Sequence, residues 1–225
     1  MSGTDVVRAR KACGWKQRQL AKELGISQGY VSLLERSRRN VPNHLARRLS
    51  RVLHLSADTL PMGLKRMPLA SRQAASVLGR FGYPGFAYLR RGSTLNPAEM
   101  LVRTLEAKNV EARLVEALPW VLLKYSNLDW DWLLREVKVR DLQNRLGFVV
   151  TMARELAEHR GEVHTAQTLS HWERVLEHSR LQREDGFRES LTSAERNWLR
   201  ANRSEVAVKW NVLSNLSTTA LYDAF

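Results

Sequence analysis

Two aspartates in this 225-residue chain have the spacing of a catalytic pair. Asp129 and Asp131 form an Asp-x-Asp motif, which could bind a metal ion or a nucleotide. A catalytic pair of this kind sits on a strand shortly after a Gly-Ser turn, whereas here Gly92-Ser93 lies 36 residues upstream and the surrounding pattern is helical. Capping of a helix that begins near Trp130 is therefore the better account of the pair.

The histidines are spaced for a helix surface rather than for a metal site. His164, His171 and His178 recur every seven residues, whereas two ligands of one ion on a helix usually lie three or four apart. Glu155 and His159 have the right spacing but lack a second histidine. The sequence contains no Gly-rich phosphate loop, no Gly-x-Ser-x-Gly turn and no Cys–His pairing context. We therefore predict no catalytic residue, no metal, no cofactor and no enzymatic activity.

The amino-acid composition excludes several classes of protein. A hydrophobic content of 44% is enough for a proper core, and the length suggests one or two domains. No apolar run reaches the length of a membrane helix, and the polar, basic N-terminus lacks the apolar region of a signal peptide. Cys13 is the only cysteine, which excludes a disulfide framework within one chain. We expect a cytoplasmic protein of bacterial type with no membrane partner.

Positive charge is concentrated at one end of the chain. The net charge is +13, with +8 in residues 1–60, +6 in residues 61–97 and −1 in residues 98–225. Neutralisation of nucleic-acid phosphates explains this asymmetry directly, because the basic half would face the polyanion. The sequence therefore predicts a nucleic-acid-binding N-terminal region and a nearly neutral remainder.

The segment 15–36 carries the signals for two short helices joined by a tight turn; its sequence is WKQRQLAKELGISQGYVSLLER. We expect helices over about 16–24 and 28–36, because Gly25 can close the first helix at positive φ and Ser27 can cap the second. The predicted core side consists of Leu20, Ala21, Leu24, Ile26, Val31 and Leu34. An apolar base under a polar outer face, flanked by arginines, is typical of a helix that reads the major groove of DNA.

From about Val6 to Leu60 the sequence resembles the helix-turn-helix of the phage-repressor family (Cro/C1, XRE-like). The matching residues are Gly14, Trp15, Gln17, Leu20, Ala21, Gly25, Ile26, Ser27, Gln28, Val31, Ser32, Glu35 and Pro42. The resemblance implies that the residue matching Gln17 bonds a phosphate and that the one matching Gln28 reads a base edge. It also implies that positions 29, 32 and 33 face the groove, where Gly29 has no side chain and Leu33 offers only apolar contact, for instance to a thymine methyl group.

The predicted DNA-binding residues extend into the loop after the second helix, where exposed arginines can contact phosphates and so position the protein. The full predicted set is Gln17, Arg18, Ser27, Gln28, Gly29, Tyr30, Ser32, Leu33, Arg36, Arg38, Arg39 and Asn40.

The predicted fold class is all-α, with a five-helix phage-repressor-like domain followed by a larger helical module. We expect a DNA-binding domain over 1–62, a basic Pro/Gly-rich linker or packed connector over 63–97, and a helical partner-binding or dimerisation domain over 98–225. Further helices are predicted near 5–12, 42–53, 57–60, 71–80, 98–108, 111–125, 130–139, 141–159, 164–182 and 192–214.

Two segments are open to more than one interpretation. The aromatic run 81–88 is expected to pack on the next domain, although with Arg90 and Arg91 it could also stack on unpaired bases. Gln143, Asn144 and Arg145 could form a polar core network or a partner-binding site, or could simply be solvated.

These patterns predict a sequence-specific transcriptional repressor that binds a palindromic operator in double-stranded DNA as a homodimer. The dimer seam could use the helix 192–214 or the fourth and fifth helices. Residues 78–158 diffusely resemble helix-turn-helix antitoxins encoded beside abortive-infection nucleotidyltransferase-like toxins; Gly82-Tyr83-Pro84-Gly85 and Leu118-Pro119-Trp120 carry part of this likeness. The resemblance implies an autoregulating antitoxin of a toxin–antitoxin or phage-defence operon, with a toxin as partner. The alternative is a ligand-sensing transcriptional regulator with a helical effector domain.

Overall fold

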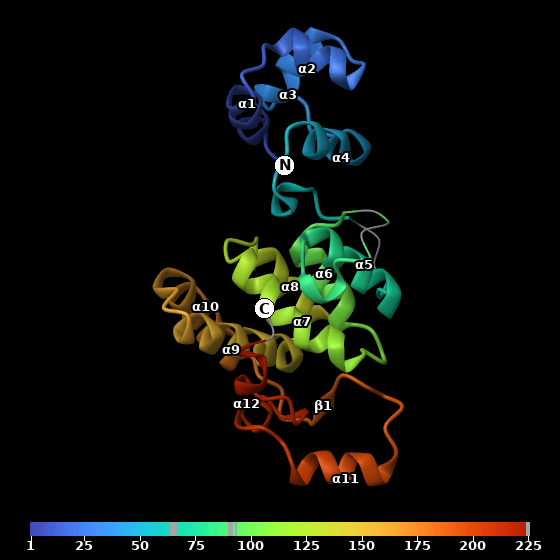
Figure 1. Cartoon of the computed structure of the whole chain (residues 1–225), viewed down its shortest axis with the longest axis vertical. Coiled ribbons are helices and arrows are strands. Elements are labelled where there is room, and N and C mark those ends of the chain that lie inside the picture. The colour runs from blue at the N-terminus through green and yellow to red at the C-terminus, as the bar shows by residue number, and fades with distance from the viewer. Residues whose placement is uncertain (64–66, 90–91, 93, 224–225) are drawn as a thin grey trace. The chain divides into compact units, whose positions relative to one another are not determined.

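The computed structural model describes residues 1–63, 67–89, 92 and 94–223, and almost all of its regular structure is helical (Figure 1). The chain forms two compact units. The first unit comprises residues 1–65 and 94–96, and the second comprises residues 66–93 and 97–225. The predicted all-α class is confirmed, apart from a pair of two-residue parallel strands in the second unit.

The first unit contains four α-helices and a 3₁₀ turn among its described residues. They are α1 (Gly3–Ala12), α2 (Gln17–Leu24), α3 (Gln28–Glu35), α4 (Asn43–Val52) and η1 (Ala57–Thr59). Helix α1 begins two residues before the prediction because Ser2 and Asp5 form a capping box. The expected fifth helix is a single 3₁₀ turn, η1.

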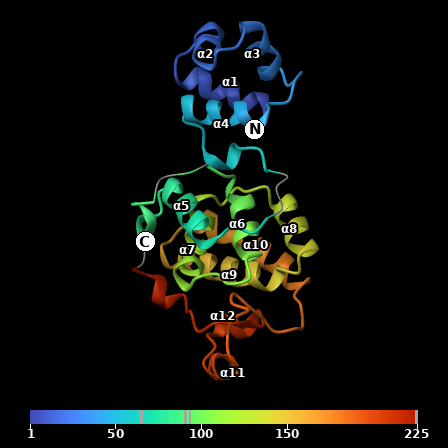
Figure 2. The ribbon, with the colours of Figure 1, turned by 90° about the vertical axis from the view of Figure 1, so that its right-hand side faces the viewer.

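The core of the first unit joins all four α-helices. Its buried members are Val6, Leu20, Ala21, Leu24, Val31, Leu34, Leu45, Leu49 and Leu53. Each large aliphatic side chain buried in this way contributes about 1.5–3 kcal/mol. Helices α2 and α3 lie side by side, with α1 and α4 packed beneath them (Figure 2). The core therefore fixes the angle at which α3 presents its outer face.

The second unit is built around α9 (Gln143–His159), which is buried on most of its surface. Helix α10 (Val163–Glu177) lies along it and α7 (Ala112–Lys124) packs on it. The remaining elements are α5 (Ser71–Phe81), η2 (Pro84–Phe86), α6 (Pro97–Leu105), α8 (Trp130–Val139), β1 (Asp185–Gly186), α11 (Ser193–Ala201), α12 (Glu205–Lys209), β2 (Val212–Leu213) and η3 (Thr219–Leu221). Strands β1 and β2 pair in parallel.

The aromatic segment 81–88 packs within the second unit. The rings of Tyr83 and Trp120 meet edge to face, with 5.4 Å between centroids, and Lys124 Nζ lies 5.0 Å from the Trp120 ring. Phe81 and Phe86 are buried, whereas Tyr88 is exposed. The predicted packing role is confirmed for the buried rings; Arg90 and Arg91, which entered the alternative of base stacking, lie outside the described residues.

The predicted helix 192–214 is wrong, because the chain there forms α11, α12 and β2 separately. Helix α11 ends at Ala201, because the next residue, Asn202, has a non-helical φ of −121°. Ser204 then caps α12 by accepting a hydrogen bond from the Ala207 amide. Figure 1 shows α11 set apart from the helices of the second unit, with extended chain at both ends. A continuous helix would carry Trp210 away from its slot on α9, where its ring packs over Gly147 and is fully buried.

Asn144, near the start of α9, holds the chain that follows α10, where the predicted helix 164–182 stops at Glu177. The buried Asn144 side chain donates to the Leu181 carbonyl and accepts from the Leu181 amide, both at 2.9 Å. Arg145 forms an ion pair with Asp185 and donates to the Leu105 carbonyl at 2.7 Å. Of the interpretations open for this segment, the structure shows the polar core network for Asn144 and Arg145.

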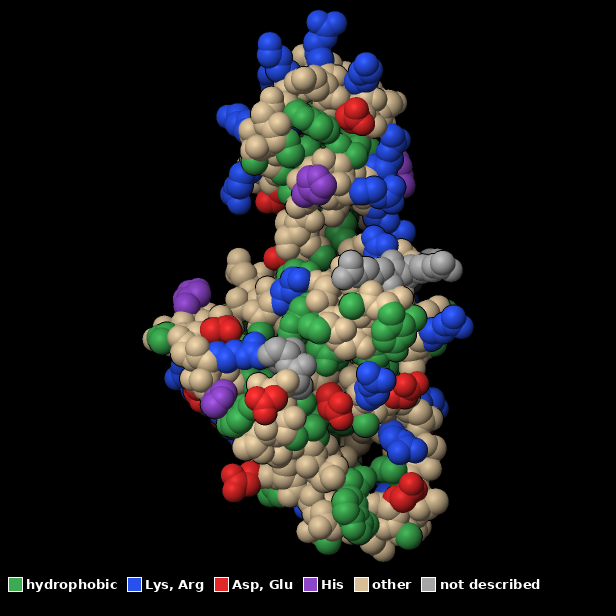
Figure 3. Space-filling model, in the orientation of Figure 1, with side chains coloured by type: hydrophobic (Ala, Val, Ile, Leu, Met, Phe, Trp, Pro, Cys, Tyr) green, Lys and Arg blue, Asp and Glu red, His purple; other side chains and the backbone are tan. Residues whose placement is uncertain are grey.

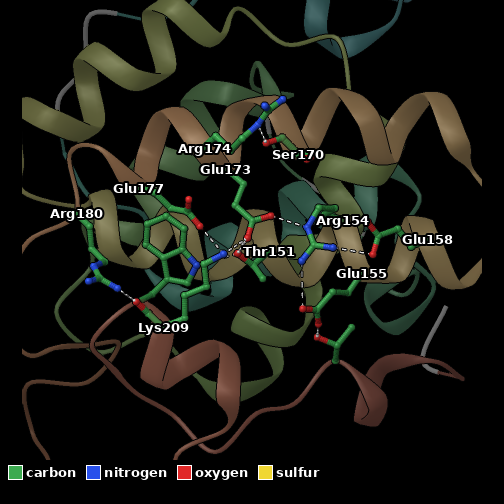
Figure 4. A network of polar contacts seen from close by, with 12 residues as sticks. Thr151, Arg154, Glu155, Glu158, Ser170, Glu173, Arg174, Glu177, Arg180 and Lys209 are labelled. Atoms are coloured by element: carbon green, nitrogen blue, oxygen red, sulfur yellow. Dashed lines mark hydrogen bonds and ion pairs between the residues drawn. The ribbon is translucent and has the colours of Figure 1, made fainter.

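A second buried network fastens the C-terminal segment to α9 and α10 (Figure 4). Glu173 on α10 accepts from Thr151 and Arg154 on α9, at 2.8 and 2.5 Å, and pairs with Lys209 of α12 at 2.6 Å. Burial alone would raise the pKa of Glu173, but the hydrogen bonds from Lys209, Arg154 and Thr151 outweigh it and hold the pKa below its usual value. Trp210 joins the network by donating its indole N–H to Thr151 at 2.8 Å.

Candidate nucleic-acid interface

The turn between α2 and α3 has the geometry that the sequence predicted. Gly25 adopts the left-handed conformation, with φ +62°, and ends α2. The Ser27 hydroxyl then accepts a hydrogen bond from the Tyr30 amide at 3.1 Å and starts α3. Only residues 25–27 connect the two helices. Glycine suits the first of these positions, because other residues rarely adopt the positive φ found there.

Helix α3 divides into a buried side and an outer face. Val31, Leu34 and Glu35 are buried, whereas the predicted base-reading positions lie outside the core. Gln28 and Gly29 are exposed, and Tyr30, Ser32 and Leu33 are half-buried, as is Gln17 on α2; Arg18 and Ser27 are exposed. A Cβ atom added at Gly29 would meet nothing closer than the Ser27 hydroxyl at 4.0 Å. The outer face of α3 therefore has space at position 29 for a side chain, which glycine does not supply.

A buried ion pair fixes the C-terminal end of α3. Arg10 on α1 donates two hydrogen bonds to the Glu35 carboxylate, at 2.5 and 3.1 Å, and a third to the Trp15 carbonyl at 2.6 Å. Gln17 on α2 donates its side-chain amide to the same carboxylate at 2.8 Å. Burial alone would raise the pKa of Glu35, but the hydrogen bonds from Arg10 and Gln17 outweigh it and hold the pKa below its usual value. The reading helix is thus tied to both preceding helices.

This network refines the role expected for Gln17. Its side-chain amide is engaged with Glu35, but its backbone N–H lies in the first turn of α2, where helix N–H groups have no partner within the helix. That backbone group is the one suited to a phosphate. Glu35 was predicted only as a residue that matches the family, and neither its pairing nor Arg10 was predicted. The available signal was an acid at a core-facing position of α3, four residues after Val31.

Close packing also holds α3 against the start of α1. A Cβ atom at Gly3 would lie 2.4 Å from the Leu34 carbonyl oxygen and 2.6 Å from that of Glu35. Both atoms are backbone, so they cannot move aside without shifting the helix. Glycine at this position therefore permits the contact between the two helices.

The cations of the first unit are almost all unpaired. Within the described residues, Arg10 is the only one of the twelve Lys and Arg side chains of residues 1–60 that forms an ion pair. Arg36, Arg38, Arg39 and Asn40 are exposed on the loop that follows α3, and the amides of Arg38 and Arg39 both donate to the Leu33 carbonyl. Figure 3 shows many Lys and Arg side chains on the visible face of the first unit and few acidic ones. Positive charge that is not neutralised internally surrounds the reading helix.

The paired short helices, the glycine turn and the exposed outer face agree with the comparison to known families. Residues 7–60 match the family model described as helix-turn-helix. Residues 7–60 are a Cro/C1-type helix-turn-helix domain. No curated protein and no solved structure matches the chain significantly. With this helix-turn-helix, the protein is a DNA-binding transcription regulator.

The residues considered for catalysis or metal binding occupy ordinary helical positions. The Asp129 carboxylate accepts a hydrogen bond from the Trp132 amide at 3.0 Å and so caps α8, as the sequence predicted. His164, His171 and His178 are exposed on or just beyond α10, and His178 contacts the Arg174 carbonyl at 2.6 Å. In the described part of the chain, no helix is both long and apolar enough to cross a membrane.

Proposed function

We propose that the protein is a sequence-specific transcriptional repressor that binds a palindromic operator as a homodimer. The observation that carries the proposal is the outer face of α3, which is anchored from behind by Glu35 and flanked by exposed, unpaired arginines. One α3 helix would enter the major groove of each half-site, and the bound dimer would block access to a promoter.

The proposed contacts divide into base reading and phosphate binding. The Gln28 amide suits the donor and acceptor edge of adenine, Ser32 can bond several base edges, and Leu33 can pack on a thymine methyl group. Gly29, the remaining groove-facing position of α3, has no side chain with which to contact a base. The groups proposed for the backbone are the N-terminal amide of Gln17 and the side chains of Arg18, Ser27, Tyr30, Arg36, Arg38, Arg39 and Asn40.

Selection from a random duplex library with the full-length protein tests this proposal. We expect a palindromic site whose half-sites lie about one helical turn apart, or a multiple of it, bound by a dimer. Gln28→Ala should then relax the preference at one base pair of each half-site by about 1–3 kcal/mol while the salt dependence stays the same. Recovery of no enriched sequence, or binding as a monomer to an asymmetric site, would contradict the proposal.

We further propose that the regulator is the autoregulating antitoxin of a toxin–antitoxin or phage-defence operon. The likeness of residues 78–158 to antitoxins paired with nucleotidyltransferase-like toxins supports this role. The charge distribution is compatible with it, because residues 98–225 have a net charge of −1 and offer little attraction for a second polyanion. Such a regulator acts on genomic DNA, so we place it in the cytoplasm, which cell fractionation would check.

Co-expression tests the antitoxin role. The protein should rescue cells from the toxin encoded beside its gene, and it should repress a reporter placed behind its own promoter. Failure to rescue, with repression intact, would remove the antitoxin role and leave the repressor. We propose no catalytic activity for the chain: Asp129→Asn with Asp131→Asn should leave both rescue and repression unchanged.

A further inference from the structure

Helix α4 presents a continuous basic surface on the side opposite its core residues. Leu45, Ala46, Leu49 and Leu53 are buried. The exposed face is formed by His44, Arg47, Arg48 and Arg51, which span an arc of about 100° at 3.6 residues per turn. Residues 41–57 contain no acid. Figure 3 shows Lys, Arg and His side chains gathered where Figure 1 places α4.

The charges of this face repel one another and are not neutralised within the unit. Arg47 and Arg51 are four residues apart on the helix, a spacing at which like charges are destabilising. Arg48 donates to the Glu23 carbonyl oxygen at 3.0 Å, which is an uncharged acceptor. The structure gives no carboxylate partner to Arg47, Arg48 or Arg51 among the residues that it describes. A polyanion laid on the face would relieve this repulsion.

The basic face follows directly in sequence on the loop already assigned to DNA. After α3 ends at Glu35, the chain passes through the exposed loop with Arg38 and Arg39 to Pro42, which immediately precedes α4. His44 and Arg47 then follow in the first and second turns of α4. Exposed cations therefore run without an intervening acid from the end of the reading helix to Arg51.

We propose that the basic face of α4 binds backbone phosphates of the same duplex that α3 reads, beyond the base pairs in contact with α3. The inference rests on the DNA-binding role and extends its footprint. Phosphates are the expected ligand because isolated arginines on a helix surface neutralise charge without fixing a base edge. A second copy of the chain is a poor occupant, since a two-fold interface would place this face against itself and bring like charges together.

The test is the salt dependence of binding for Arg47→Gln with Arg51→Gln, on a selected site embedded in a duplex of about 40 base pairs. Loss of two phosphate contacts in each protomer of the bound dimer should reduce the slope of log K against log salt by about 3.6. Between 50 and 200 mM salt, the advantage of the unsubstituted protein should shrink roughly 150-fold. Base preference should not change. On a duplex trimmed to the base pairs that α3 reads, the two proteins should have the same slope.

Controls separate this effect from general charge and from folding. Arg135→Gln with Lys138→Gln removes the same charge from exposed positions of α8 and should leave the slope unchanged. Arg47→Lys with Arg51→Lys should restore the slope, because a phosphate contact needs only a positive charge. An unchanged slope for the glutamine variant on the long duplex would overturn the proposal.

Other outcomes would identify a different occupant of the face. If the glutamine variant lost only the ability to bring two labelled duplexes together, α4 would bind a second duplex and the proposal would be wrong. If it changed only the oligomeric state, the occupant would be a second copy. If the unsubstituted protein bound no duplex, the proposed repressor function would be wrong. If it bound DNA and the glutamine variant bound with the same salt dependence, only the proposed α4 contact would be wrong.

Discussion

In the first unit Arg10 is the only ion-paired cation of residues 1–60 within the structure described, whereas arginines of the second unit are repeatedly matched to carboxylates. Arg154, for example, lies within ion-pair distance of three carboxylates, those of Glu155, Glu158 and Glu173. The same residue type therefore has two uses in one chain. Exposed, unmatched arginines attract a polyanion, while buried, matched ones join helices that are distant in sequence.

Net charge alone therefore does not locate a binding surface. Residues 98–225, which make up most of the second unit, hold eighteen basic and nineteen acidic residues, and many of these charges are matched in ion pairs. In the first unit the single pair, Arg10 with Glu35, stabilises the reading helix and leaves the remaining cations for a ligand. Substitutions of similar chemistry should accordingly affect binding in one unit and stability in the other.

The largest expected effect is the loss of DNA affinity when Arg36, Arg38 and Arg39 are changed together to Gln. Three phosphate contacts in each protomer, at a slope of about 0.9 each, correspond to a roughly 500-fold loss of affinity per half-site at 0.1 M salt. Titration with a labelled duplex at several salt concentrations measures this loss. The thermal unfolding temperature should not fall, because the three side chains are exposed.

The matched control removes the same charge from exposed positions of the second unit, as Arg135→Gln, Lys138→Gln and Arg188→Gln. An equal loss of affinity in this variant would mean that DNA responds to the overall charge of the chain and not to the arginines of the first unit.

The next largest effect is on stability, from Glu173→Ala in the second unit. The substitution leaves Arg154 and Lys209 without a shared buried carboxylate, which should cost about 3 kcal/mol in the free energy of unfolding. Denaturant titration gives the free energy, and hydrogen exchange of amides in α9 and α12 gives its location. DNA affinity measured well below the unfolding temperature should stay within twofold. A large loss of affinity with normal stability would show that the network serves the DNA site.

Gly147→Ala should destabilise the second unit by about 2 kcal/mol. Its Cβ atom would lie 2.3 Å from the buried Trp210 ring, so either the ring or α9 must move. The near-ultraviolet circular dichroism of the tryptophans should change together with stability. Trp210→Leu in the same background should recover part of the loss if the clash with the ring is the cause. Wild-type stability for Gly147→Ala would mean that the Trp210 ring can move away from α9 at little cost in free energy.

The smallest expected effect has the opposite sign. Gly29→Ala should stabilise the first unit by roughly 0.5 kcal/mol, because alanine favours the helix and its Cβ atom enters open space. Differential scanning calorimetry can detect the change, and base preference should be retained. Destabilisation by this substitution would indicate that the outer face of α3 is packed against something, contrary to its role as a free reading surface.

Local signals in the sequence were sufficient for the helix-turn-helix. Gly25 ends α2 and Ser27 starts α3 through contacts within three residues, so the residue types alone predict the turn. The capping role of Asp129 was predictable for the same reason. Exposure of Gln28 and burial of Val31 followed from helical periodicity, which places them on different sides of a helix fixed by its own core.

The contacts that sequence reasoning missed join residues far apart in the chain. Arg10 meets Glu35 across 25 positions, and Trp210 meets Thr151 across 59. A helical pattern also continues through residues 192–214, but the burial of Trp210 over Gly147 favours a broken chain there. Such tertiary contacts override the local helix propensity, and they cannot be predicted from the spacing of residues within a single segment.

The amide of Asn96 has a consequence for the order of folding. It donates to the carbonyls of Asp58 and Leu60, at 2.8 Å each, although 36 residues separate Asn96 from Leu60. Residues 94–96 belong to the first unit, while the described residues 67–89 belong to the second. During synthesis, therefore, the helix-turn-helix can assemble its core early, but the end of its domain stays unfinished until residue 96 has left the ribosome. By then the chain has already begun the second unit.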